Sequence, residues 1–414
     1  MPFAGHVGAL SAVAGELTHR GHEVVAYTGA KYRQRFTSLG ATWLPRVKAA
    51  DFDDADLAAT FPAVGDGKGF RGAQANGEHV LFGTAPGQIE DILAAAPFDL
   101  LVADQTAFGA AIAGQKLGIP WATAAVTPLS LTSRDLPPVG APWAPGAGPA
   151  GRLRDAVARR LFSTIYRRIT DPKLNRLRAS VGLGPLAPGR LFDGIYSTDL
   201  VLAQGVPGLE YPRTDLPAAV HYVGRLAWPS TGGAANLPTW WPDLAAARTV
   251  VHVTQGTLDV DPADLLRPTL AALADEDVLV VCTTGGADPA LLGPLPANAR
   301  AAAFIPHDQL LPLVDVMVTN GGWNGTLAAI EAGVPLVVAG GSLDKPEVAR
   351  RVAWSGVGID LRTGAPTQAR IARAVRAVAA RPSFRSRARE LGTALTAAGG
   401  THTAADLLDA LLAR

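Results

Sequence analysis

The residues best suited to chemistry in this sequence form a glycine-rich turn in the second half of the chain. The turn reads Asn320-Gly321-Gly322-Trp323-Asn324-Gly325-Thr326 and separates the apolar run Val314–Thr319 from a helical pattern. Glycines let a backbone turn tightly, and a helix start offers unpaired N–H groups with a partial positive charge. The turn therefore fits a phosphate group, with side-chain donors from Asn320, Asn324 and Thr326. The same spacing also fits an ordinary joint between a strand and a helix.

A second turn follows the same logic. Gln255-Gly256-Thr257 comes directly after the apolar run Thr249–Thr254. Gly256 permits close approach of a ligand, and Thr257 offers a hydroxyl. Ligands gather beyond the carboxyl ends of parallel strands, so two such turns in one sheet favour a nucleotide.

A histidine and an aspartate in the first half are candidates for acid–base chemistry. His6 precedes an amphipathic helical pattern, and Asp104 follows the apolar run Phe98–Ala103. An unperturbed imidazole titrates near pH 6.5, and a carboxylate partner stabilises the imidazolium that forms when the ring takes a proton. The residues alone also fit a surface histidine and an aspartate that caps a helix.

The spacing of the aspartates and histidines does not indicate a metal site. Three Asp-x-Asp-type triplets stand in polar loops or helix starts, where solvated charge explains them: 54–56, 259–261 and 275–277. Five histidines lack ligand spacing and are interpreted as structural or surface residues: His19, His22, His79, His221 and His402. His252 lies inside an apolar strand and is interpreted as a hydrogen-bonded core histidine. We expect no metal and no other cofactor.

Short β-rich runs alternate with helical patterns along the chain. The predicted strands of the first half are His22–Thr28, Phe98–Ala103, Pro120–Val126, Asp199–Ala203 and Val220–Val223. Those of the second half are Thr249–Thr254, Val278–Thr283, Ala301–Ile305, Val314–Thr319, Pro335–Ala339 and Val357–Leu361. Several runs are apolar without alternation, as in central strands covered on both faces. The pattern predicts an α/β protein with doubly wound parallel sheets.

The two series of strands are separated by a change in composition. Residues 229–238 are rich in proline, glycine and small residues, which indicates a linker between domains 1–228 and 239–414. The last helix, Thr401–Arg414, fits either domain. A second irregular stretch, Leu136–Gly151, holds five prolines and four glycines and predicts a functional loop or lid.

The beginning of the chain is unusual for this architecture. A doubly wound domain opens with a strand that leads into its first ligand-binding loop. Here the chain opens with Met1-Pro2-Phe3-Ala4-Gly5-His6, already at that loop. Either Met1 is internal to the natural gene, which then encodes an additional N-terminal strand, or the first strand is missing or vestigial.

Composition narrows the class of protein. The 414 residues are 48% hydrophobic and 18% charged, which is typical of a globular protein. The net charge of +1 does not indicate a nucleic-acid partner. The single cysteine, Cys282, excludes an internal disulfide framework and suits a reducing cytoplasm. No apolar run approaches the ~20 residues that span a bilayer, and the opening residues do not form a signal peptide. We expect a cytoplasmic monomer or homodimer without membrane contact.

In the order and spacing of its motifs, the chain resembles family 1 of the glycosyltransferases. In the second half the matching segments are Phe304–Leu311, Asn320–Leu327, Ala332–Pro335 and Leu343–Glu347. In the first half they are Gly5–Val7, Arg20–Val24 and Leu101–Asp104. The resemblance covers nearly the whole chain. It implies the GT-B fold, in which two doubly wound (Rossmann-like) parallel-sheet domains face each other.

The resemblance also implies a donor site for a UDP- or dTDP-sugar. Phe304 stands where an aromatic residue stacks on the nucleotide base, with the Ile305 backbone at the base edge and His307 at the neighbouring polar position. The diphosphate would lie on the two glycine turns, held by Gly256, Thr257, Asn320, Gly322, Asn324, Gly325 and Thr326. Asp344 and Lys345 stand where an acidic residue and a glutamine bind the sugar hydroxyls.

Two positions depart from the family pattern. Asn320 replaces a histidine that contacts the diphosphate, which removes a possible cation, so leaving-group stabilisation must depend more on the helix dipole. Lys345 replaces the glutamine, and its charge could alter sugar preference or pair with Asp344 or Glu347.

The resemblance assigns His6 as the general base and Asp104 as the carboxylate that orients it. The implied enzyme is an inverting, metal-independent hexosyltransferase that acts on a hydroxyl of a small aromatic or polyketide-like natural product. Four aromatic residues could line an apolar acceptor pocket, although core packing explains them equally well: Phe61, Phe70, Phe82 and Trp143.

Two other functions remain open at this level. From Arg152 to Arg178 nine Arg/Lys stand against two Asp, interleaved with aliphatic residues at helical spacing. Such a helix can lie on anionic lipid, as a membrane-surface glycolipid glycosyltransferase requires. More often it packs its apolar stripe inward and leaves a solvated basic face. A non-catalytic nucleotide-sugar-binding accessory protein would use the same turns without a base.

Overall fold

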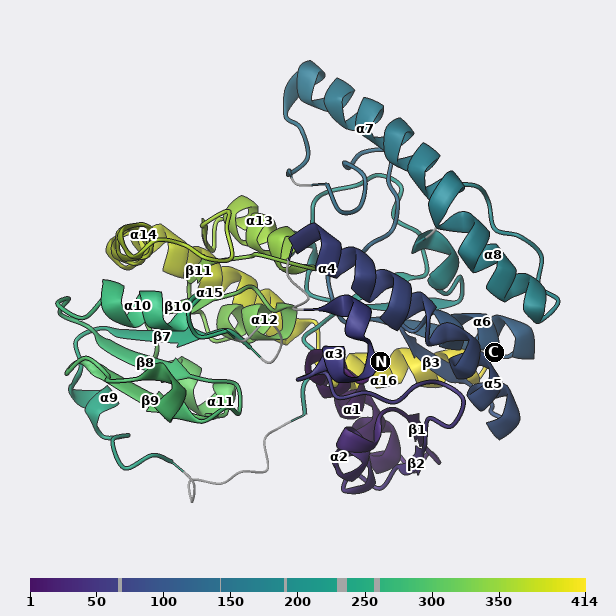
Figure 1. Cartoon of the computed structure of the whole chain (residues 1–414), viewed down its shortest axis with the longest axis horizontal. Coiled ribbons are helices and arrows are strands. Elements are labelled where there is room, and N and C mark those ends of the chain that lie inside the picture. Colours follow the sequence, from purple (N-terminus) through teal and green to yellow (C-terminus); the bar gives the residue numbers. More distant parts are fainter. Residues whose placement is uncertain (66–68, 142, 190–191, 229–236, 257–260) are drawn as a thin grey trace. The chain divides into compact units, whose positions relative to one another are not determined.

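The computed structural model describes residues 1–65, 69–141, 143–189, 192–228, 237–256 and 261–414, without the side chains of Phe70 and Phe192. These residues form two compact units (Figure 1). Unit 1 comprises Met1–Pro207, Tyr211–Trp228 and Ala398–Arg414, and unit 2 comprises Gly208–Glu210 and Pro229–Ala397. The chain therefore returns to unit 1 for its last helix. Residues 229–236 of the predicted linker lie outside the described residues.

The described strands of unit 1 form two parallel sheets. One has the strand order β3-β4-β5-β6, and the other pairs β1 with β2. Their bounds are β1 Val25–Tyr27, β2 Thr42–Leu44, β3 Leu101–Asp104, β4 Trp121–Ala125, β5 Leu200–Gln204 and β6 Val220–Gly224. In register, Asp104 lies opposite Ala124 and Val25 opposite Thr42. Five of these strands overlap predicted runs. The three-residue β2 is too short to stand out in the sequence.

The helices of unit 1 connect and cover these strands. They are α1 Ala4–His19, α2 Arg33–Thr37, α3 Leu57–Thr60, α4 Gly69–Ala75, α5 Ala85–Ala95, α6 Phe108–Leu117, α7 Gly148–Ile169, α8 Asp171–Ser180 and α16 Gly400–Leu412. The predicted loop Leu136–Gly151 ends earlier than expected, because α7 begins at Gly148. None of the described helices is long and apolar enough to cross a membrane.

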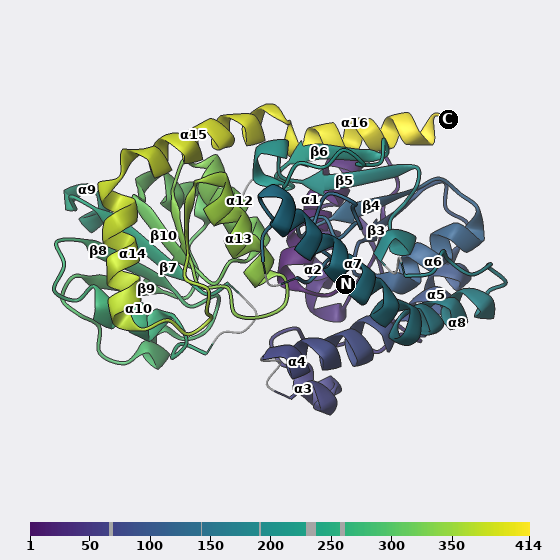
Figure 2. The same ribbon diagram turned by 90° about the horizontal axis from the view of Figure 1, so that it is seen from above.

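The last helix packs on unit 1, against α1, β5 and β6 (Figure 2). An ionic network fixes it to the end of α1. Arg20 donates to Glu16, Asp406 and Asp409, and His22 lies 2.7 Å from Asp409. Apolar contacts add to the network, because Ala404, Leu408 and Leu411 belong to the same buried cluster as Ala9 and Val13.

Unit 2 is built on a parallel sheet with the described strand order β12-β11-β10-β7-β8-β9. The bounds are β7 Val250–Thr254, β8 Leu279–Thr283, β9 Ala299–Ala302, β10 Val316–Thr319, β11 Leu336–Val338 and β12 Gly358–Asp360. This is the doubly wound order, which reverses direction between the neighbouring strands β7 and β10. The predicted strand Ala301–Ile305 was placed about two residues too late, and Ile305 lies beyond β9.

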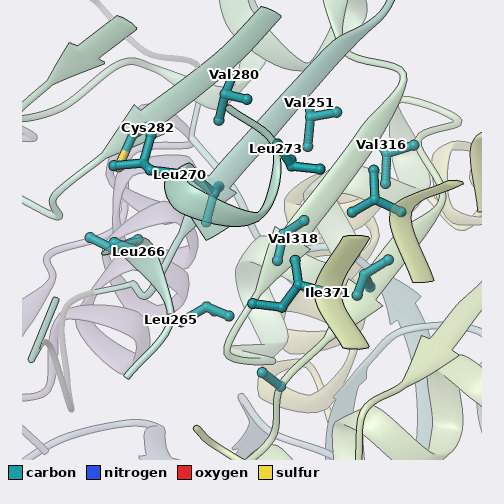
Figure 3. Packing of buried hydrophobic residues seen from close by; sticks show 14 of the residues in the cluster. Val251, Leu265, Leu266, Leu270, Leu273, Val280, Cys282, Val316, Val318 and Ile371 are labelled. Atoms are coloured by element: carbon teal, nitrogen blue, oxygen red, sulfur yellow. The ribbon is translucent and has the colours of Figure 1, made fainter. Parts of the chain in front are cut away.

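The sheet of unit 2 is covered by helices over a large apolar core. The helices are α9 Asp243–Ala246, α10 Leu266–Ala272, α11 His307–Leu310, α12 Trp323–Glu331, α13 Lys345–Ser355, α14 Gln368–Ala380 and α15 Pro382–Ala397. Figure 3 shows part of this core, in which Val251, Val280 and Val316 from three strands pack with Leu270 and Ile371 from helices. Such unalternating strands are apolar because both sheet faces are covered. Cys282 lies in this core, where burial raises the pKa of its thiol to about 12.

Candidate active site

Unit 1 brings the predicted acid–base pair together. His6 lies in the first turn of α1 rather than before the helix, and Asp104 is the last residue of β3. The His6 Nδ1 atom lies 2.7 Å from Asp104 Oδ2, and the imidazole remains 16% exposed while the carboxylate is 1% exposed. A proton on Nδ1 that donates to Asp104 leaves Nε2 as an acceptor. The pair therefore has the geometry of a base oriented by a carboxylate.

The surroundings keep Asp104 ionised. Thr106 donates to Oδ1 from its backbone N–H and from its hydroxyl, each at 2.8 Å, and the Met1 ammonium donates to Oδ2 at 3.1 Å. Burial alone would raise the pKa of this carboxyl, but His6, the Met1 ammonium and the hydrogen bonds hold it well below its usual range. Asp104 does not cap α6, whose N-cap is Ala107.

A second carboxylate, not predicted for this role, holds the helix that carries His6. Asp54 Oδ2 accepts the backbone N–H of Ala4 at 2.7 Å, at the start of α1. Its other oxygen accepts from Tyr32 and Lys31, each at 2.7 Å. The interpretation of Asp54 as solvated charge is wrong, since the residue is only 4% exposed. Asp56 does begin a helix, because it accepts the N–H of Ala59 in α3.

Unit 2 places both glycine turns at the point where the strand order reverses. Thr254 at the end of β7 and Thr319 at the end of β10 are partners across the two strands. The segments Gln255-Gly256 and Asn320-Gly321-Gly322 therefore leave the same edge of the sheet side by side. This edge is where open α/β sheets bind ligands. Thr257 lies outside the described residues.

Asn320 links the two turns. Its side-chain amide donates to the backbone carbonyl of Gln255, and its Oδ1 atom accepts the N–H of Gly322 at 3.3 Å. The side chain is buried, so its described role is to fix the shape of both turns. Gly321 is required here, because its φ is +92° and a Cβ atom would lie 2.8 Å from Val338 Cγ1.

The start of α12 supplies backbone donors. The first hydrogen bond of the helix runs from Thr326 N to Gly322 O, and the N–H groups of residues 323–325 precede it. The N-cap residue Gly322 makes no side-chain cap. The predicted hydroxyl donor Thr326 is fully buried, and its Oγ1 has no hydrogen-bond partner in the part of the chain that the structure describes. The features of this turn that suit an anion are therefore first the backbone N–H groups and the helix dipole.

The residues predicted to bind the nucleotide base differ in exposure. Phe304 is 72% exposed between β9 and α11, whereas Ile305 is only 2% exposed. His307 begins α11 and lies beside the α12 turn, where a Cβ atom on Gly325 would be 3.7 Å from its Cε1. An exposed aromatic ring is compatible with stacking on a base.

Lys345 lies against the same turn. A Cβ atom on Gly321 would lie 3.7 Å from Lys345 Cβ, and Asp344 immediately precedes α13, which Lys345 begins. Lys345 is 5% exposed, and its ammonium has no hydrogen bond or ion pair with any described residue. The expected alternative of a Glu347 partner is not realised, because Glu347 pairs with Arg351 at 3.2 Å.

Three of the four aromatic residues predicted for the acceptor pocket have separate partners. Phe61 packs edge-on against Phe52, and Phe82, at the end of the π-helical segment Asn76–Phe82, packs against Phe108. Trp143 donates from Nε1 to Asp155 Oδ1 of α7 at 2.9 Å. Phe70 lies in α4, and its side chain is outside the described part of the structure. Among the described side chains, these contacts do not gather Phe61, Phe82 and Trp143 into one pocket.

Helix α7 presents an apolar stripe to solvent. Its members are spaced four residues apart and are 40 to 66% exposed: Leu153, Val157, Leu161, Ile165 and Ile169. Arg152, Arg154, Arg160, Arg167 and Arg168 are exposed on the same helix. The expectation that the stripe packs inward is therefore wrong. Asp155, Ala158 and Phe162 occupy the inward side instead.

His252 is a core histidine, as predicted, but only one of its two ring nitrogens has a hydrogen-bond partner among the described residues. Nδ1 lies 3.0 Å from the Val281 carbonyl, whereas the buried Nε2 has no hydrogen-bond partner in the described part of the chain. Burial, with a smaller contribution from His307, lowers its pKa to about 3. Among the described residues, no group of three His, Cys, Asp or Glu could hold a metal ion.

Comparison with known proteins places these features in a family. A family model described as the C-terminal domain of erythromycin biosynthesis protein CIII-like proteins matches residues 267–408. The chain is 40% identical to 4'-demethylrebeccamycin synthase of Lentzea aerocolonigenes, over 99% of this chain and 98% of that protein. It is 32% identical to UDP-glycosyltransferase 2 of Phaeomoniella chlamydospora, over 100% of this chain and 94% of the relative. This chain is a glycosyltransferase.

The fold of this glycosyltransferase agrees with its family. The crystal structure of the glycotransferase of kitacinnamycin matches 99% of this chain and 96% of its own length, with a TM-score of 0.73 at 23% identity. The glycosyltransferase has the GT-B fold, built from two parallel-sheet α/β domains. It is a natural-product glycosyltransferase, which transfers a sugar from a nucleotide sugar.

Proposed function

We propose that this glycosyltransferase moves a sugar, with inversion at the anomeric carbon, from a UDP- or dTDP-sugar to a hydroxyl of a small apolar natural product. The observation that supports it most is the 2.7 Å contact between His6 Nδ1 and Asp104 Oδ2. That contact fixes the ring so that the other nitrogen can accept a proton.

The proposed reaction is a direct displacement. His6 Nε2 takes the proton of the acceptor hydroxyl, and the oxygen forms a bond to the anomeric carbon. The bond from that carbon to the phosphate oxygen breaks, and its electron pair leaves with the nucleoside diphosphate. Asp104 stabilises the imidazolium, while the N–H groups at the start of α12 receive the developing phosphate charge.

We propose a diphosphate-binding role for Lys345 in addition to contacts with the sugar. The family histidine is replaced by Asn320, whose amide is engaged with Gln255 and Gly322. Lys345 lies close to Gly321, and its ammonium has no protein partner among the described residues. A phosphate is the kind of anion that such an ammonium binds. The lysine then supplies the cation that the asparagine lacks.

The substitution His6→Ala tests the base. Donor binding, measured by titration calorimetry with UDP and dTDP, should be retained, while kcat should fall by roughly 10² to 10⁴. The matched control is His79→Ala, which removes an exposed histidine of the same unit and should leave kcat unchanged. Undiminished transfer to a hydroxyl acceptor by His6→Ala would rule out the base assignment. Transfer by the unaltered protein would rule out the accessory-protein alternative, which predicts no transfer by the unaltered protein or by His6→Ala.

The substrates are tested by product analysis. Mass spectrometry of reactions with a panel of UDP- and dTDP-sugars and phenolic or polyketide acceptors should show one sugar added per acceptor. Lys345→Gln should weaken binding of the free diphosphate by about tenfold, the loss of one charge-assisted contact. If Lys345→Gln changes only the choice of sugar, the lysine binds the sugar and not the phosphates.

A second candidate function is transfer to an acceptor held at a membrane surface. It rests on the exposed aliphatic stripe of α7 and the five exposed arginines on the same helix. Aliphatic side chains beside basic residues favour an anionic lipid surface. Flotation with vesicles of anionic lipid at low salt should carry the protein, and Leu161→Glu should reduce the bound fraction several-fold. Absence of binding by the unaltered protein would dismiss this candidate.

A further inference from the structure

The loop that leads from β11 into α13 contains a leucine with an unusual backbone. Leu343 has a φ of +53°, in the left-handed region that bulky side chains rarely adopt. Among the described residues, Arg362 is the other non-glycine residue with a positive φ. Such a conformation costs free energy and persists only where the surrounding structure imposes it, and such residues cluster at functional sites. A functional role for Leu343 would explain why the protein retains this cost.

A tight turn imposes this backbone on Leu343. The N–H of Lys345 donates to the carbonyl of Ser342 at 3.1 Å, which closes a four-residue turn. Leu343 and Asp344 are its central residues, and Asp344 has φ −79° and ψ −17°. A positive φ followed by these angles matches a type II′ turn, in which glycine normally occupies the first central position. Leucine therefore stands where glycine would relieve the strain.

Close approaches of the neighbouring backbone keep the turn in this shape. A Cβ atom on Gly340 would lie 2.5 Å from the carbonyl oxygen of Lys345, so the loop runs directly against the start of α13. A Cβ atom on Gly341 would lie 2.8 Å from the Cα atom of Gly364, so the loop also touches the segment after β12. The turn therefore cannot relax without moving its neighbours.

The side chain of Leu343 is not fully buried in return for this strain. Val338 at the end of β11 and the following Ala339 are at most 1% exposed, whereas Leu343 is 44% exposed. An apolar side chain stabilises a structure in proportion to the area that it removes from water. Much of this leucine is therefore left to make an apolar contact with a bound ligand.

A nearby ammonium indicates which ligand covers the leucine. Lys345 is 5% exposed and has no hydrogen bond or ion pair with any described residue, and a buried ammonium of this kind takes an anion as its partner. The turn lies beyond the carboxyl end of β11, at the edge where parallel sheets bind ligands. In a nucleotide sugar, the sugar ring is attached directly to the diphosphate. A diphosphate on Lys345 therefore brings the sugar within reach of Leu343, two residues away.

We propose that Leu343 contacts the transferred sugar and selects a 6-deoxyhexose over the corresponding hexose. The assignment rests on the proposed function and adds the class of sugar that the same site takes. The exocyclic carbon of a hexose carries a hydroxyl, which would lose its water on contact with leucine. In a 6-deoxyhexose that carbon is a methyl group, which packs on leucine without such a loss. Glycine at position 343 would remove the strain and the selection together.

Three substitutions separate the side chain from the strain. Leu343→Met keeps a long apolar side chain, Leu343→Ala shortens it, and Leu343→Gly removes it together with the strain. Leu343→Gly should melt about 2 to 6 °C above Leu343→Ala, because relief of the positive φ outweighs the entropy that glycine adds to the unfolded chain. Equal melting temperatures for these two variants would remove the basis of the proposal and overturn it.

Two donors that differ by one oxygen atom measure the selection. Titration calorimetry compares UDP-glucose with UDP-6-deoxyglucose, with free UDP as the reference and the same dTDP compounds in parallel. The unaltered protein and Leu343→Met should bind the 6-deoxy donor about tenfold more tightly than the hexose donor. Leu343→Ala and Leu343→Gly should bind the two donors within about twofold of each other. The matched control Arg362→Gly removes the other positive φ of a non-glycine residue and should keep the tenfold preference.

The outcomes separate this inference from the proposed function. The same sugar preference in Leu343→Ala and in the unaltered protein overturns the inference and leaves the proposed function intact. Weaker binding of free UDP and free dTDP by Leu343→Ala also overturns it, because the residue would then only shape the phosphate site. A higher acceptor KM in Leu343→Ala with unchanged donor affinity would assign the leucine to the acceptor and overturn it as well. If the unaltered protein binds none of the four donors, the proposed function fails and the inference fails with it.

Discussion

His252 should make unit 2 sensitive to mild acid. The folded pKa is about 3 because the ring is buried, whereas an exposed histidine has a pKa of about 6.5. At pH 5 the unfolded chain therefore binds a proton that the folded chain does not. Stability falls as pH falls through the window from about 6.5 to about 3, and the loss between pH 7 and pH 5 is about 2 kcal/mol. Any folded pKa below about 4 gives the same loss at pH 5.

The assay compares the unaltered chain with His252→Gln. The glutamine amide can still donate to the Val281 carbonyl but does not titrate in this range. Hydrogen exchange at the slowest amides of β7 and β8, corrected for intrinsic rates, gives the opening free energy of unit 2 at pH 7 and pH 5. The described carboxyl groups with lowered pKa lie in unit 1, so they do not obscure the result. His307→Gln is the control and should behave like the unaltered chain. An equal loss of free energy in His252→Gln and the unaltered chain would refute the reasoning.

Three further predictions concern unit 2. Gly321→Ala should lower the melting temperature by about 3 to 10 °C, because the positive φ of this residue disfavours alanine and the new Cβ atom would lie 2.8 Å from Val338 Cγ1. The control Gly325→Ala should leave the melting temperature unchanged or raise it. Asn320→Ala should weaken UDP binding about tenfold in calorimetry, because the two glycine turns lose the hydrogen bond that links them. Asn320→His should retain or improve UDP binding. A severe loss of turnover in a folded Asn320→His variant would contradict the second expectation. Glu210→Gln should destabilise unit 2 by about 3 kcal/mol in urea unfolding, since Arg351 is buried with it at 3.0 Å, and an unchanged midpoint would show the pair to be dispensable.

The sequence was sufficient for the parts of the fold that depend on local patterns. Central parallel strands are apolar at consecutive positions, so β7, β8 and β10 stood out as runs, and the glycine turns after β7 and β10 followed from them. The pairing of His6 with Asp104 was predicted from the resemblance and is present in the structure, while the catalytic roles of the two residues stay predictions.

Features that depend on distant contacts were missed. Asp54 lies 50 positions from the helix start that it binds, and nothing in its acidic neighbours distinguishes it from solvated charge. The Asn320 amide was predicted to face the phosphates, because the chain order does not show that the Gln255 carbonyl lies within its reach. The prediction that the apolar stripe of α7 packs inward was also wrong. Helical periodicity identifies an apolar face but does not show what that face contacts.

The return of the chain to unit 1 at Ala398 has a consequence for biosynthesis. Unit 2 is complete in sequence before α16 leaves the ribosome, whereas unit 1 waits for its last 17 residues, 398–414. Domains fold as units during synthesis, so unit 2 can finish folding first although most of unit 1 precedes it in the sequence. A nonsense mutation that removes only α16 would then leave the Ala9 and Val13 surface of unit 1 uncovered. Cellular quality control would then meet a misfolded amino-terminal unit beside a folded unit 2.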